Sequence, residues 1–304
     1  MPDTVRQGGG VTGGVGLTAL MVAAARAVET YRPDALARDV YAEHFVRAAR
    51  ASASWPVRPD QVPGGEADPL WGRLGRYFGL RTRVLDDFLL RQASAGVRQV
   101  VLLGAGLDTR ALRLEWPPGC TVFEIDQEEV LAFKAGVLDS PATGGGLSTG
   151  AQAVRVAIAA DLRLDWGAVL VRAGFDPAAP TAWLAEGLLL YLPGAAERRL
   201  IDTVDRLSAA GSSLGYEAKL GVESAAVRDS PVYAAAKQRI GVDLLALFDG
   251  EPRPDSAGDL AGRGWSTAVR TPFHFTRRHG RGPRPESPDA LAANRWVFAH
   301  RPAR

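Results

Sequence analysis

The stretch that most constrains the fold of this chain is an apolar run that ends in a Gly-x-Gly turn. Val100 to Leu103 are four consecutive apolar residues, and Gly104-Ala105-Gly106 follows them directly. A short apolar run of this kind is typical of a strand buried on both faces of a parallel sheet. The two glycines permit positive φ in a tight turn and let a ligand approach the backbone without meeting a Cβ atom.

The residues after this turn predict a short helix. Asp108 or Thr109 is suited to cap a helix from Thr109 to Leu114, and Trp116-Pro117-Pro118 brings that helix to an end. The strand, the glycine turn and the helix N-terminus together predict a cradle for a nucleotide cofactor.

A second strand supplies an acid at the spacing that a ribose requires. Residues 121–126 form an apolar strand that ends at Asp126, twenty residues after Gly106. At this spacing a carboxylate reaches the ribose hydroxyls of a bound nucleotide. Glu124, two residues earlier on the same strand face, is the alternative ribose ligand. A carboxylate that only caps the helix beginning at Gln127 is the structural alternative.

The glycine pattern also indicates the kind of nucleotide. Thr109 stands where the dinucleotide fingerprint has its third glycine, so a pyrophosphate on the helix N-terminus is disfavoured. A nucleoside without phosphates fits better, and S-adenosylmethionine is the cofactor that we predict. An oxidoreductase that binds NAD on the same turn is an alternative.

Several separated segments resemble one enzyme family in the same order along the chain. They are residues 81–88, 104–110, 123–127, 185–193 and the pair Gly264-Trp265. From about Leu17 to its C-terminus, the chain resembles the leucine carboxyl methyltransferase superfamily. It is most similar to the actinobacterial branch of S-adenosylmethionine-dependent methyltransferases, which includes polyketide-tailoring O-methyltransferases.

This resemblance implies the α/β class I methyltransferase fold, a Rossmann-like, mostly parallel doubly wound sheet with an antiparallel closing strand and an N-terminal helical cap. The sequence patterns agree with that expectation. Further strands are expected at 153–160, 181–185 and 213–217, with helices between them, and two closing strands at 267–270 and 296–299.

The chain divides by pattern into a tail, a cap and a main domain. Residues 1–16 are Gly-rich and are expected to be disordered. Residues 17–80 are expected to form a helical cap or lid, with a Pro-rich surface loop from 51 to 69. Residues 81–304 are expected to form the cofactor-binding domain, with a cap insertion around 219–256 and a Gly-rich surface loop at 141–146.

Composition narrows the class of partner. The net charge is +2 and basic residues are spread between acids, so no nucleic-acid partner is expected. No stretch is long enough to span a membrane, and a single cysteine suits the reducing cytoplasm. The predicted partner is a small-molecule methyl acceptor, and the oligomeric state stays open.

Acids at two further strand ends are candidates for holding the cofactor, because ligands bind at the carboxyl ends of strands in open α/β sheets. Asp161 is placed to accept from the adenine amino group, with the Leu162 backbone nearby; its structural alternative is a turn aspartate bonded to its own backbone. Glu186, followed by Gly187, would face the ammonium of the methionine moiety. Its structural alternative is an ion pair with an arginine of the cap.

The resemblance also implies that Arg83 clamps the methionine carboxylate, since a guanidinium offers two parallel donors to a carboxylate. Arg81 is the neighbour that could replace it, and a solvated helix arginine is the structural alternative.

No residue stands in a motif that marks it as an indispensable general base. The candidates for that role are His44, His274 and Tyr191. The four histidines lack ligand spacing, so no metal site is expected. We therefore predict an S-adenosylmethionine-dependent O-methyltransferase that acts on the carboxylate or hydroxyl of a small molecule, with a role in secondary metabolism. A protein that binds S-adenosylmethionine but catalyses a rearrangement or cyclisation is the alternative.

Overall fold

The computed structural model describes residues 13–140, 153–219, 225–248 and 252–303. Within these ranges a seven-stranded sheet has the order β3-β2-β1-β4-β5-β7-β6. The strands are β1 Gln99–Leu103, β2 Thr121–Asp126, β3 Val154–Ala159, β4 Thr181–Ala185, β5 Ser213–Lys219, β6 Ser266–Arg270 and β7 Asn294–His300. Strands β1 to β5 are parallel, and β7 runs antiparallel to both β5 and β6. This arrangement confirms the predicted fold class.

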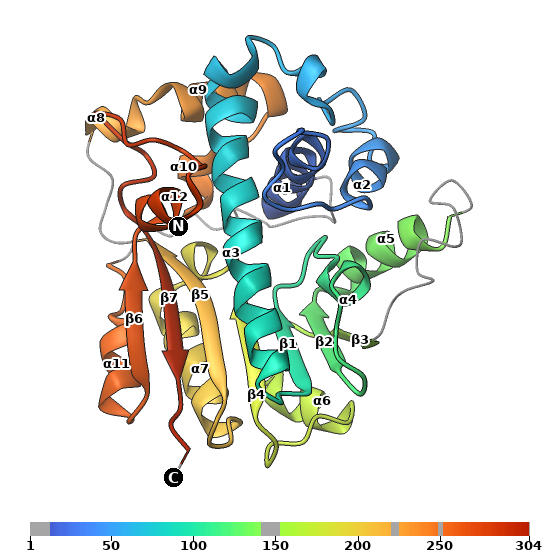
Figure 1. Ribbon diagram of the computed structural model, residues 1–304, viewed down its shortest axis with the longest axis vertical. Helices are drawn as coiled ribbons and strands as arrows, with labels where there is room; N and C mark the ends of the chain where they lie inside the picture. The colour runs from blue at the N-terminus through green and yellow to red at the C-terminus, as the bar shows by residue number, and fades with distance from the viewer. Residues whose placement is uncertain (1–12, 141–152, 220–224, 249–251, 304) are drawn as a thin grey trace, which may run out of the picture.

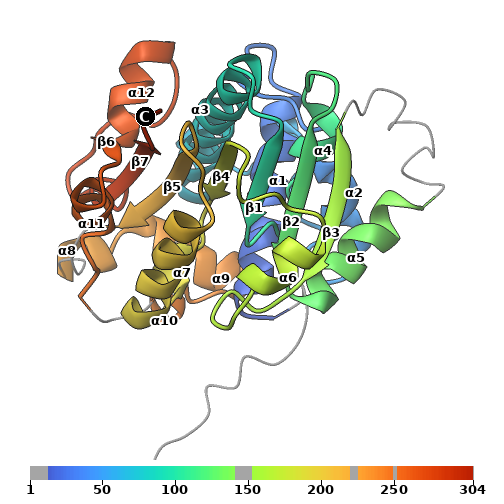
Figure 2. The ribbon, with the colours of Figure 1, turned by 90° about the horizontal axis from the view of Figure 1, so that it is seen from below.

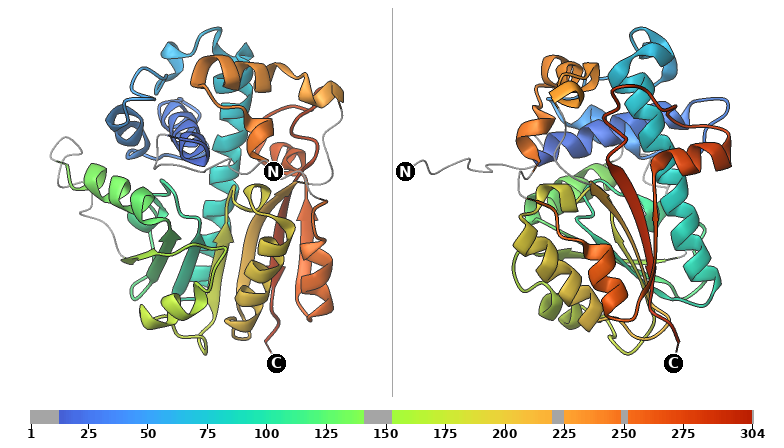
Figure 3. Two further views of the ribbon diagram at one scale, coloured as in Figure 1. Left: turned by 180° about the vertical axis from the view of Figure 1, so that it is seen from behind. Right: turned by 90° about the vertical axis from the view of Figure 1, so that its left-hand side faces the viewer.

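Helices cover both faces of the sheet (Figures 2 and 3). One face carries α3 Gly75–Ser94, α4 Arg110–Arg113 and α12 Pro272–His279, and the other carries α6 Gly167–Arg172, α7 Gly194–Arg206 and α11 Ser256–Gly262. The sheet separates two apolar cores because alternate residues of a strand point to opposite faces. Val100 and Leu102 pack in the core beneath α3, whereas Val101 and Leu103 pack in the core beneath α6 and α7.

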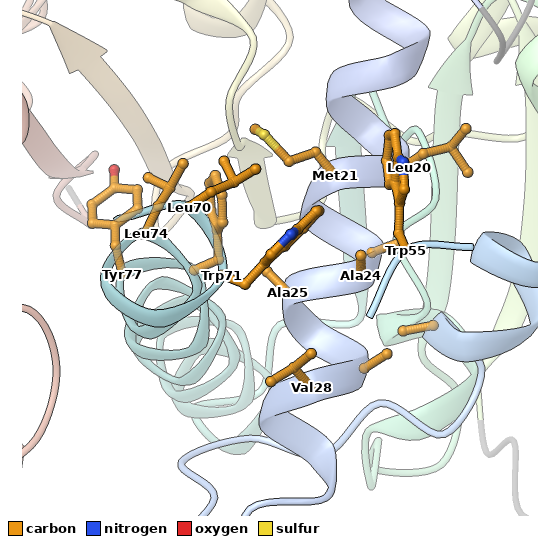
Figure 4. Packing of buried hydrophobic residues seen from close by; sticks show 14 of the residues in the cluster. Leu20, Met21, Ala24, Ala25, Val28, Trp55, Leu70, Trp71, Leu74 and Tyr77 are labelled. Atoms are coloured by element: carbon orange, nitrogen blue, oxygen red, sulfur yellow. The ribbon is translucent and has the colours of Figure 1, made fainter. Parts of the chain in front are cut away.

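A third group of helices lies beyond the carboxyl ends of the parallel strands (Figure 1). It contains α1 Val15–Thr30, α2 Ala42–Ala48, the turns η1 Pro59–Gln61, η2 Gly65–Ala67 and η3 Pro69–Leu74, α8 Ala225–Arg228, α9 Pro231–Ile240 and α10 Leu244–Leu247. Helix α5 Glu128–Leu138 packs against β3 and α2, and the short turn η5 Leu189–Tyr191 follows β4. The large cluster of buried apolar side chains in Figure 4 joins α1 to η3 and to the first turn of α3.

The segment from 51 to 69 differs from the predicted surface loop. Trp55, Val57 and Val62 are buried in the cluster that surrounds α1, and the Trp55 ring lies 5.8 Å from that of Trp71. The prolines end regular structure here, but the apolar side chains between them still pack against the neighbouring helices instead of facing water. The loop is therefore part of the cap core.

The predicted domain boundaries can be compared with the helix bounds and with the described residues. Helix α1 begins at Val15, inside the predicted 1–16 tail, and the remainder of that tail up to residue 12 lies outside the described residues. The boundary between residues 80 and 81 falls inside α3, a continuous helix that packs on the sheet and also reaches the cap. The Gly-rich loop at 141–146 lies outside the described residues, as do 220–224 and 249–251 of the cap insertion. Among the helices that the structure describes, none combines the length and apolar character needed to cross a membrane.

Candidate cofactor and acceptor site

One cavity of about 770 Å³ lies between the carboxyl edge of the sheet and the helices above it. The loops after β1, β2, β3 and β4 and the end of β5 form its floor, and residues of α1, α3, α9 and α10 form its walls and roof. Most of the residues predicted from the sequence to bind the cofactor line this cavity. They are Gly104, Ala105, Gly106, Asp108, Asp126, Gln127, Asp161, Leu162, Glu186 and Gly187.

The glycine turn is tied to the end of β2. The backbone N–H of Gly106 donates to Oδ2 of Asp126 at 2.6 Å, and the N–H of Gln127 donates to Oδ1 at 2.7 Å. Burial raises the pKa of Asp126, and the two N–H donors oppose that shift. Each carboxylate oxygen retains a further lone pair, so Asp126 can still accept from two hydroxyl groups.

The turn itself suits a nucleoside. Gly104 has φ of +65° and Gly106 has φ of +48°, a region that side chains other than glycine seldom adopt. Neither glycine presents a Cβ atom to the cavity that it lines. The turn therefore lets a ligand approach the backbone next to the carboxylate of Asp126.

Asp161 makes the turn hydrogen bond that was its structural alternative, and it also lines the cavity. Its Oδ1 accepts from the backbone N–H of Arg163 at 2.8 Å, and its carboxylate is ion-paired with the Arg163 guanidinium at 2.6 Å. That hydrogen-bonded guanidinium lowers the pKa of Asp161. Asp161, Leu162 and Arg163 nevertheless all line the cavity, on the side of the Gly106 turn where Gln127 and Val130 also lie.

Glu186 lies at the centre of a buried ion-pair network. Its Oε1 is 2.8 Å from Nε of Arg81, and its Oε2 accepts from Nη1 of Arg110 at 2.5 Å. Burial alone would raise its pKa, but Arg110 and Arg81 lower the pKa of Glu186 to about 2. The arginines that pair with Glu186 lie on α3 and α4 rather than in the predicted cap, and Glu186 still faces the cavity.

Asp108 and Thr109 are neighbours in sequence but make different contacts. Asp108 accepts from the backbone N–H of Arg110 at 2.7 Å, which caps α4, and its other oxygen is ion-paired with the Arg110 guanidinium. Thr109 is the N-cap residue by position but makes no side-chain cap hydrogen bond; its hydroxyl accepts from Nε of Arg113. Thr109 is buried and does not line the cavity.

The structure does not bring Arg83 or Glu124 into the site. Nε of Arg83 pairs with Asp87 at 3.0 Å on the outer face of α3, and almost half of the Arg83 side chain is exposed. Arg81, two residues earlier, points to the cavity instead, because positions i and i+2 of a helix lie on different faces. Glu124 is completely buried away from the cavity between Lys134 and Arg155, at 2.8 Å from each.

The candidates for a general base are also separated. His44 lies on α2, and His274 lies on α12, where its ring meets that of Phe275. Neither histidine lines the cavity, but Tyr191 does. A hydrogen bond links Tyr191 to Thr18, and burial raises the pKa of the tyrosine hydroxyl.

Glu217 is the acid in this cavity that sequence analysis did not single out. It is the last buried residue of β5. Its carboxylate accepts from the Tyr77 hydroxyl and from Nη1 of Arg81 at 2.7 Å. Burial raises the pKa of Glu217 to about 7. The rule that selected Asp161 and Glu186, an acid at the carboxyl end of a parallel strand, applies to Glu217 equally.

The end of the cavity around Glu217 has a different character from the cofactor end. Its described lining residues are mainly aromatic and aliphatic: Leu74, Tyr77, Val232, Tyr233, Leu244, Phe248 and Leu291, with Lys219 and Asn294. The Lys219 ammonium lies 4.5 Å from the centre of the Phe248 ring and donates to the Tyr233 hydroxyl at 3.1 Å. One cavity therefore joins the glycine turn and the acids at the strand ends to an apolar compartment.

Comparison with known proteins finds a matching family model, similar sequences and a solved structure that aligns with this chain. The family model described as leucine carboxyl methyltransferase matches residues 19–205. A Streptomyces coelicolor protein that carries the name of an S-adenosyl-L-methionine-dependent methyltransferase is 65% identical over 99% of this chain and 99% of its own length. A Saccharopolyspora erythraea protein with the same designation is 48% identical over 84% of each chain. Among solved structures, a methyltransferase from Thermobifida fusca aligns with a TM-score of 0.49 at 18% identity, over 76% of this chain and 83% of its own.

Proposed function

Because this chain belongs to the leucine carboxyl methyltransferase family and is an S-adenosylmethionine-dependent methyltransferase, we propose that it transfers the methyl group to an oxygen atom of a small molecule. The observation that supports this proposal is the single cavity that runs from Asp126 to Tyr233 and Phe248. Its volume of about 770 Å³ falls within the range of roughly 300–1,000 Å³ that is usual for small-molecule sites. A macromolecular acceptor would need an open groove instead.

The residues of the cavity suit the two ends of the cofactor. Asp126 would accept from the ribose hydroxyls, and Asp161 with the Leu162 backbone would meet the adenine. Arg81 takes the place that the resemblance gave to Arg83, and with Glu186 it would hold the charged amino-acid end. When bound, S-adenosylmethionine supplies a methyl group activated by its sulfonium.

The chain itself then has two tasks, to align the acceptor oxygen with the methyl carbon and to exclude water. The roof of α1 and η3 serves the second task because Met21 and Leu74 line the cavity from this side. The apolar side chains around them pack into one cluster (Figure 4). Leu74 and Tyr77 line the apolar compartment from the same helical segment, so they would fix the body of the acceptor. A role in secondary metabolism follows from the resemblance to the actinobacterial branch, and the buried free thiol of Cys120 is consistent with a cytoplasmic enzyme.

The test is methyl transfer from S-adenosylmethionine carrying a radioactive methyl group into an organic extract of an actinobacterial culture. We expect label in a small organic product. Treatment of that product with mild base releases labelled methanol from a methyl ester but leaves a methyl ether intact, which identifies the acceptor group. Label recovered only on protein or nucleic acid would contradict a small-molecule acceptor. Conversion of S-adenosylmethionine without loss of its methyl group would favour the non-methylating alternative.

A further inference from the structure

We propose that Glu217 is the proton acceptor of this site and that the methyl acceptor is a neutral hydroxyl group on an apolar body. The inference rests on the proposed O-methyl transfer and adds the substrate class and a catalytic residue. It follows from where Glu217 lies, from the charges that surround it, and from the charge that methyl transfer removes.

Glu217 stands at the junction of the two parts of the cavity. It lies on β5 at the carboxyl edge of the sheet, only 5% exposed, and it lines the cavity together with Gly187 and Tyr77. A Cβ atom built on Gly187 would be 3.9 Å from Oε2 of Glu217, so the strand end after β4 and that after β5 approach closely here. The Tyr77 hydroxyl in turn accepts from Asn294 Nδ2 at 3.1 Å and from Trp296 Nε1 at 3.3 Å.

These contacts orient Glu217. The Tyr77 hydroxyl has its own proton directed at the carboxylate, because two donors already occupy its lone pairs. Arg81 holds the second carboxylate oxygen. Trp296 and the backbone of Gly187 also hydrogen-bond to the Glu217 carboxylate. Because Glu217 lines the cavity, an acceptor hydroxyl would approach it from the cavity side.

The charges linked to Glu217 do not balance. Within the part of the chain that the structure describes, ion pairs connect three guanidiniums with four carboxylates in one continuous network. The guanidiniums are those of Arg81, Arg110 and Arg113, and the carboxylates are those of Asp86, Asp108, Glu186 and Glu217. The network thus carries one negative charge in excess when every acid is ionised, and a buried uncompensated charge is strongly unfavourable.

Two conditions relieve this excess. Either one carboxyl group takes a proton, or a ligand with one net positive charge occupies the cavity. Glu217 is the member best placed to take the proton, because within the network it pairs only with Arg81. Arg81 also pairs with Glu186. The raised pKa of Glu217 has the same cause, namely burial without a full counter-charge.

Other charged and titratable groups on the surrounding elements also affect the ionisation of Glu217. Tyr77 and Arg81 on α3 and Lys219 on β5 act on Glu217 directly. Glu186 after β4 and Tyr191 on η5 act on it through Arg81. Lys219 favours the ionised form of Glu217, but its side chain is only half-buried and bonds to the Tyr233 hydroxyl.

S-adenosylmethionine has one net positive charge, because its sulfonium adds to a zwitterionic amino acid, whereas S-adenosylhomocysteine has none. Transfer of the methyl group to a hydroxyl breaks the carbon–sulfur bond, with the electron pair left on sulfur, and forms a carbon–oxygen bond. One proton leaves the hydroxyl. If the Glu217 carboxylate takes that proton, the network and its ligand are neutral both before and after the reaction.

A carboxylate acceptor does not give this balance. It would bring a second negative charge into the network while the cofactor is bound, and after transfer the excess charge on Glu217 would remain uncompensated. The lining around Tyr233, Leu244 and Phe248 is mainly apolar, and the ammonium of Lys219 at that end lies over the Phe248 ring and donates to the Tyr233 hydroxyl. The charge of the ion-pair network and the mainly apolar lining therefore favour a neutral hydroxyl on an apolar or aromatic body.

The experiment measures proton release on binding. S-adenosylmethionine and S-adenosylhomocysteine are titrated into the protein by calorimetry at pH 7, in buffers of different ionisation enthalpy. We expect the sulfonium ligand to release about half a proton per site, since it displaces the proton from a group that is half protonated at this pH. Between pH 7 and pH 5.5 its dissociation constant should rise roughly tenfold, while that of S-adenosylhomocysteine should stay nearly constant.

Two variants assign the effect to this residue. Glu217→Gln should bind both ligands without proton release and should lose the preference for the sulfonium that appears above pH 7. Tyr77→Phe keeps the carboxylate but removes a donor to its ionised form, so the inflection should move to higher pH. Tyr41→Phe removes the hydroxyl of a buried tyrosine outside the cavity and should leave the wild-type curve unchanged.

Different results would contradict the role of Glu217, the hydroxyl acceptor and the proposed function. Equal proton release for the two ligands, or a wild-type pH dependence in Glu217→Gln, would overturn the role of Glu217. A methylated product that mild base converts to methanol would overturn the hydroxyl acceptor. Label found only on a macromolecule would contradict the proposed function itself, and it is read from a different measurement.

Discussion

The backbone N–H of Gly106 and the carboxylate of Asp126 are joined by a hydrogen bond of 2.6 Å, although twenty residues separate them in sequence. The two groups meet because β1 and β2 are neighbouring parallel strands that end at the same edge of the sheet. The bond fixes the glycine turn against the acid that would hold the ribose. The geometry of the turn and the position of the carboxylate are therefore set together.

This coupling predicts the effect of a side chain in the turn. Gly106→Val should abolish the rise in melting temperature that S-adenosylhomocysteine produces by mass action. A β-branched residue is strained at φ of +48° and its side chain would enter the space of the ligand. Gly136→Ala, on α5 with no atom within 4 Å of the added Cβ, is the matched control and should respond like the wild type. A normal ligand response in Gly106→Val would remove the turn from the site.

The second prediction concerns Asp126. Asp126→Ala should weaken S-adenosylhomocysteine binding by about 1.5–3 kcal/mol, or roughly ten- to a hundredfold in dissociation constant. Glu124→Gln, two residues earlier, should lower the free energy of unfolding instead, because it disrupts the buried pair with Lys134. Calorimetric titration and thermal unfolding of both variants separate the two effects. The reverse pattern would assign the ribose to Glu124.

The third prediction uses two arginines on one helix. Arg83→Ala should leave the dissociation constant unchanged and the unfolding free energy within about 0.5 kcal/mol, because its pair with Asp87 is exposed. Arg81→Ala leaves Glu186 and Glu217 without a shared counter-charge, so we expect a loss of about 3–5 kcal/mol in stability. Arg81→Lys keeps the charge but not the paired donors, and it should weaken ligand binding while the protein stays folded. An affinity loss confined to Arg83→Ala would restore the clamp role to Arg83.

The sequence predicted the sheet well because strands buried on both faces are continuous apolar runs. Residues 100–103, 121–126 and 181–185 all appear as strands within one residue of the expected bounds. Acids at the ends of these strands, such as Asp126 and Glu186, line the cavity, since the chain cannot carry them away from the sheet edge. Strand-end position is therefore a strong signal.

Residues on helices were predicted less well. The face that an arginine occupies on α3 depends on how the whole helix rotates against the sheet, so a motif alone did not separate Arg81 from Arg83. The compartment made by Lys219, Tyr233 and Phe248 combines β5 with two segments of the cap insertion. Such a contact depends on packing between distant segments, and local patterns do not encode it.

The predicted lid can be tested by hydrogen exchange. The cavity is lined by Leu74, by Tyr77 and by one face of α1, whereas α2 does not reach it. The lining residues of α1 are Gly16, Thr18, Ala19, Met21, Val22 and Arg26. Binding of S-adenosylhomocysteine should therefore slow exchange in α1 and in η3, with a smaller effect in α2. Exchange in α1 that is already slow and does not respond to ligand would show a fixed roof and would contradict the lid.

The last prediction is a pH dependence of stability that needs no ligand. Burial raises the pKa of Glu217 from 4.5 to about 7. An acid whose pKa is higher in the folded state contributes stability that is fully present below pH 4.5. This contribution is lost as the pH rises toward and through 7, because folding then requires either a bound proton or a buried charge.

Glu217→Gln is neutral at every pH, so it resembles the protonated wild-type residue. The two proteins should have similar unfolding free energies near pH 5. At pH 8 the variant should be the more stable, by up to about 3 kcal/mol for a pKa difference of this size. Urea unfolding of both proteins at pH 5, 6, 7 and 8 measures the difference directly. Because Arg81 also stabilises the ionised form, a difference that stays constant across this range would mean that Arg81 holds Glu217 ionised throughout, and the residue would then be an ion-pair partner rather than a group that exchanges protons near neutral pH.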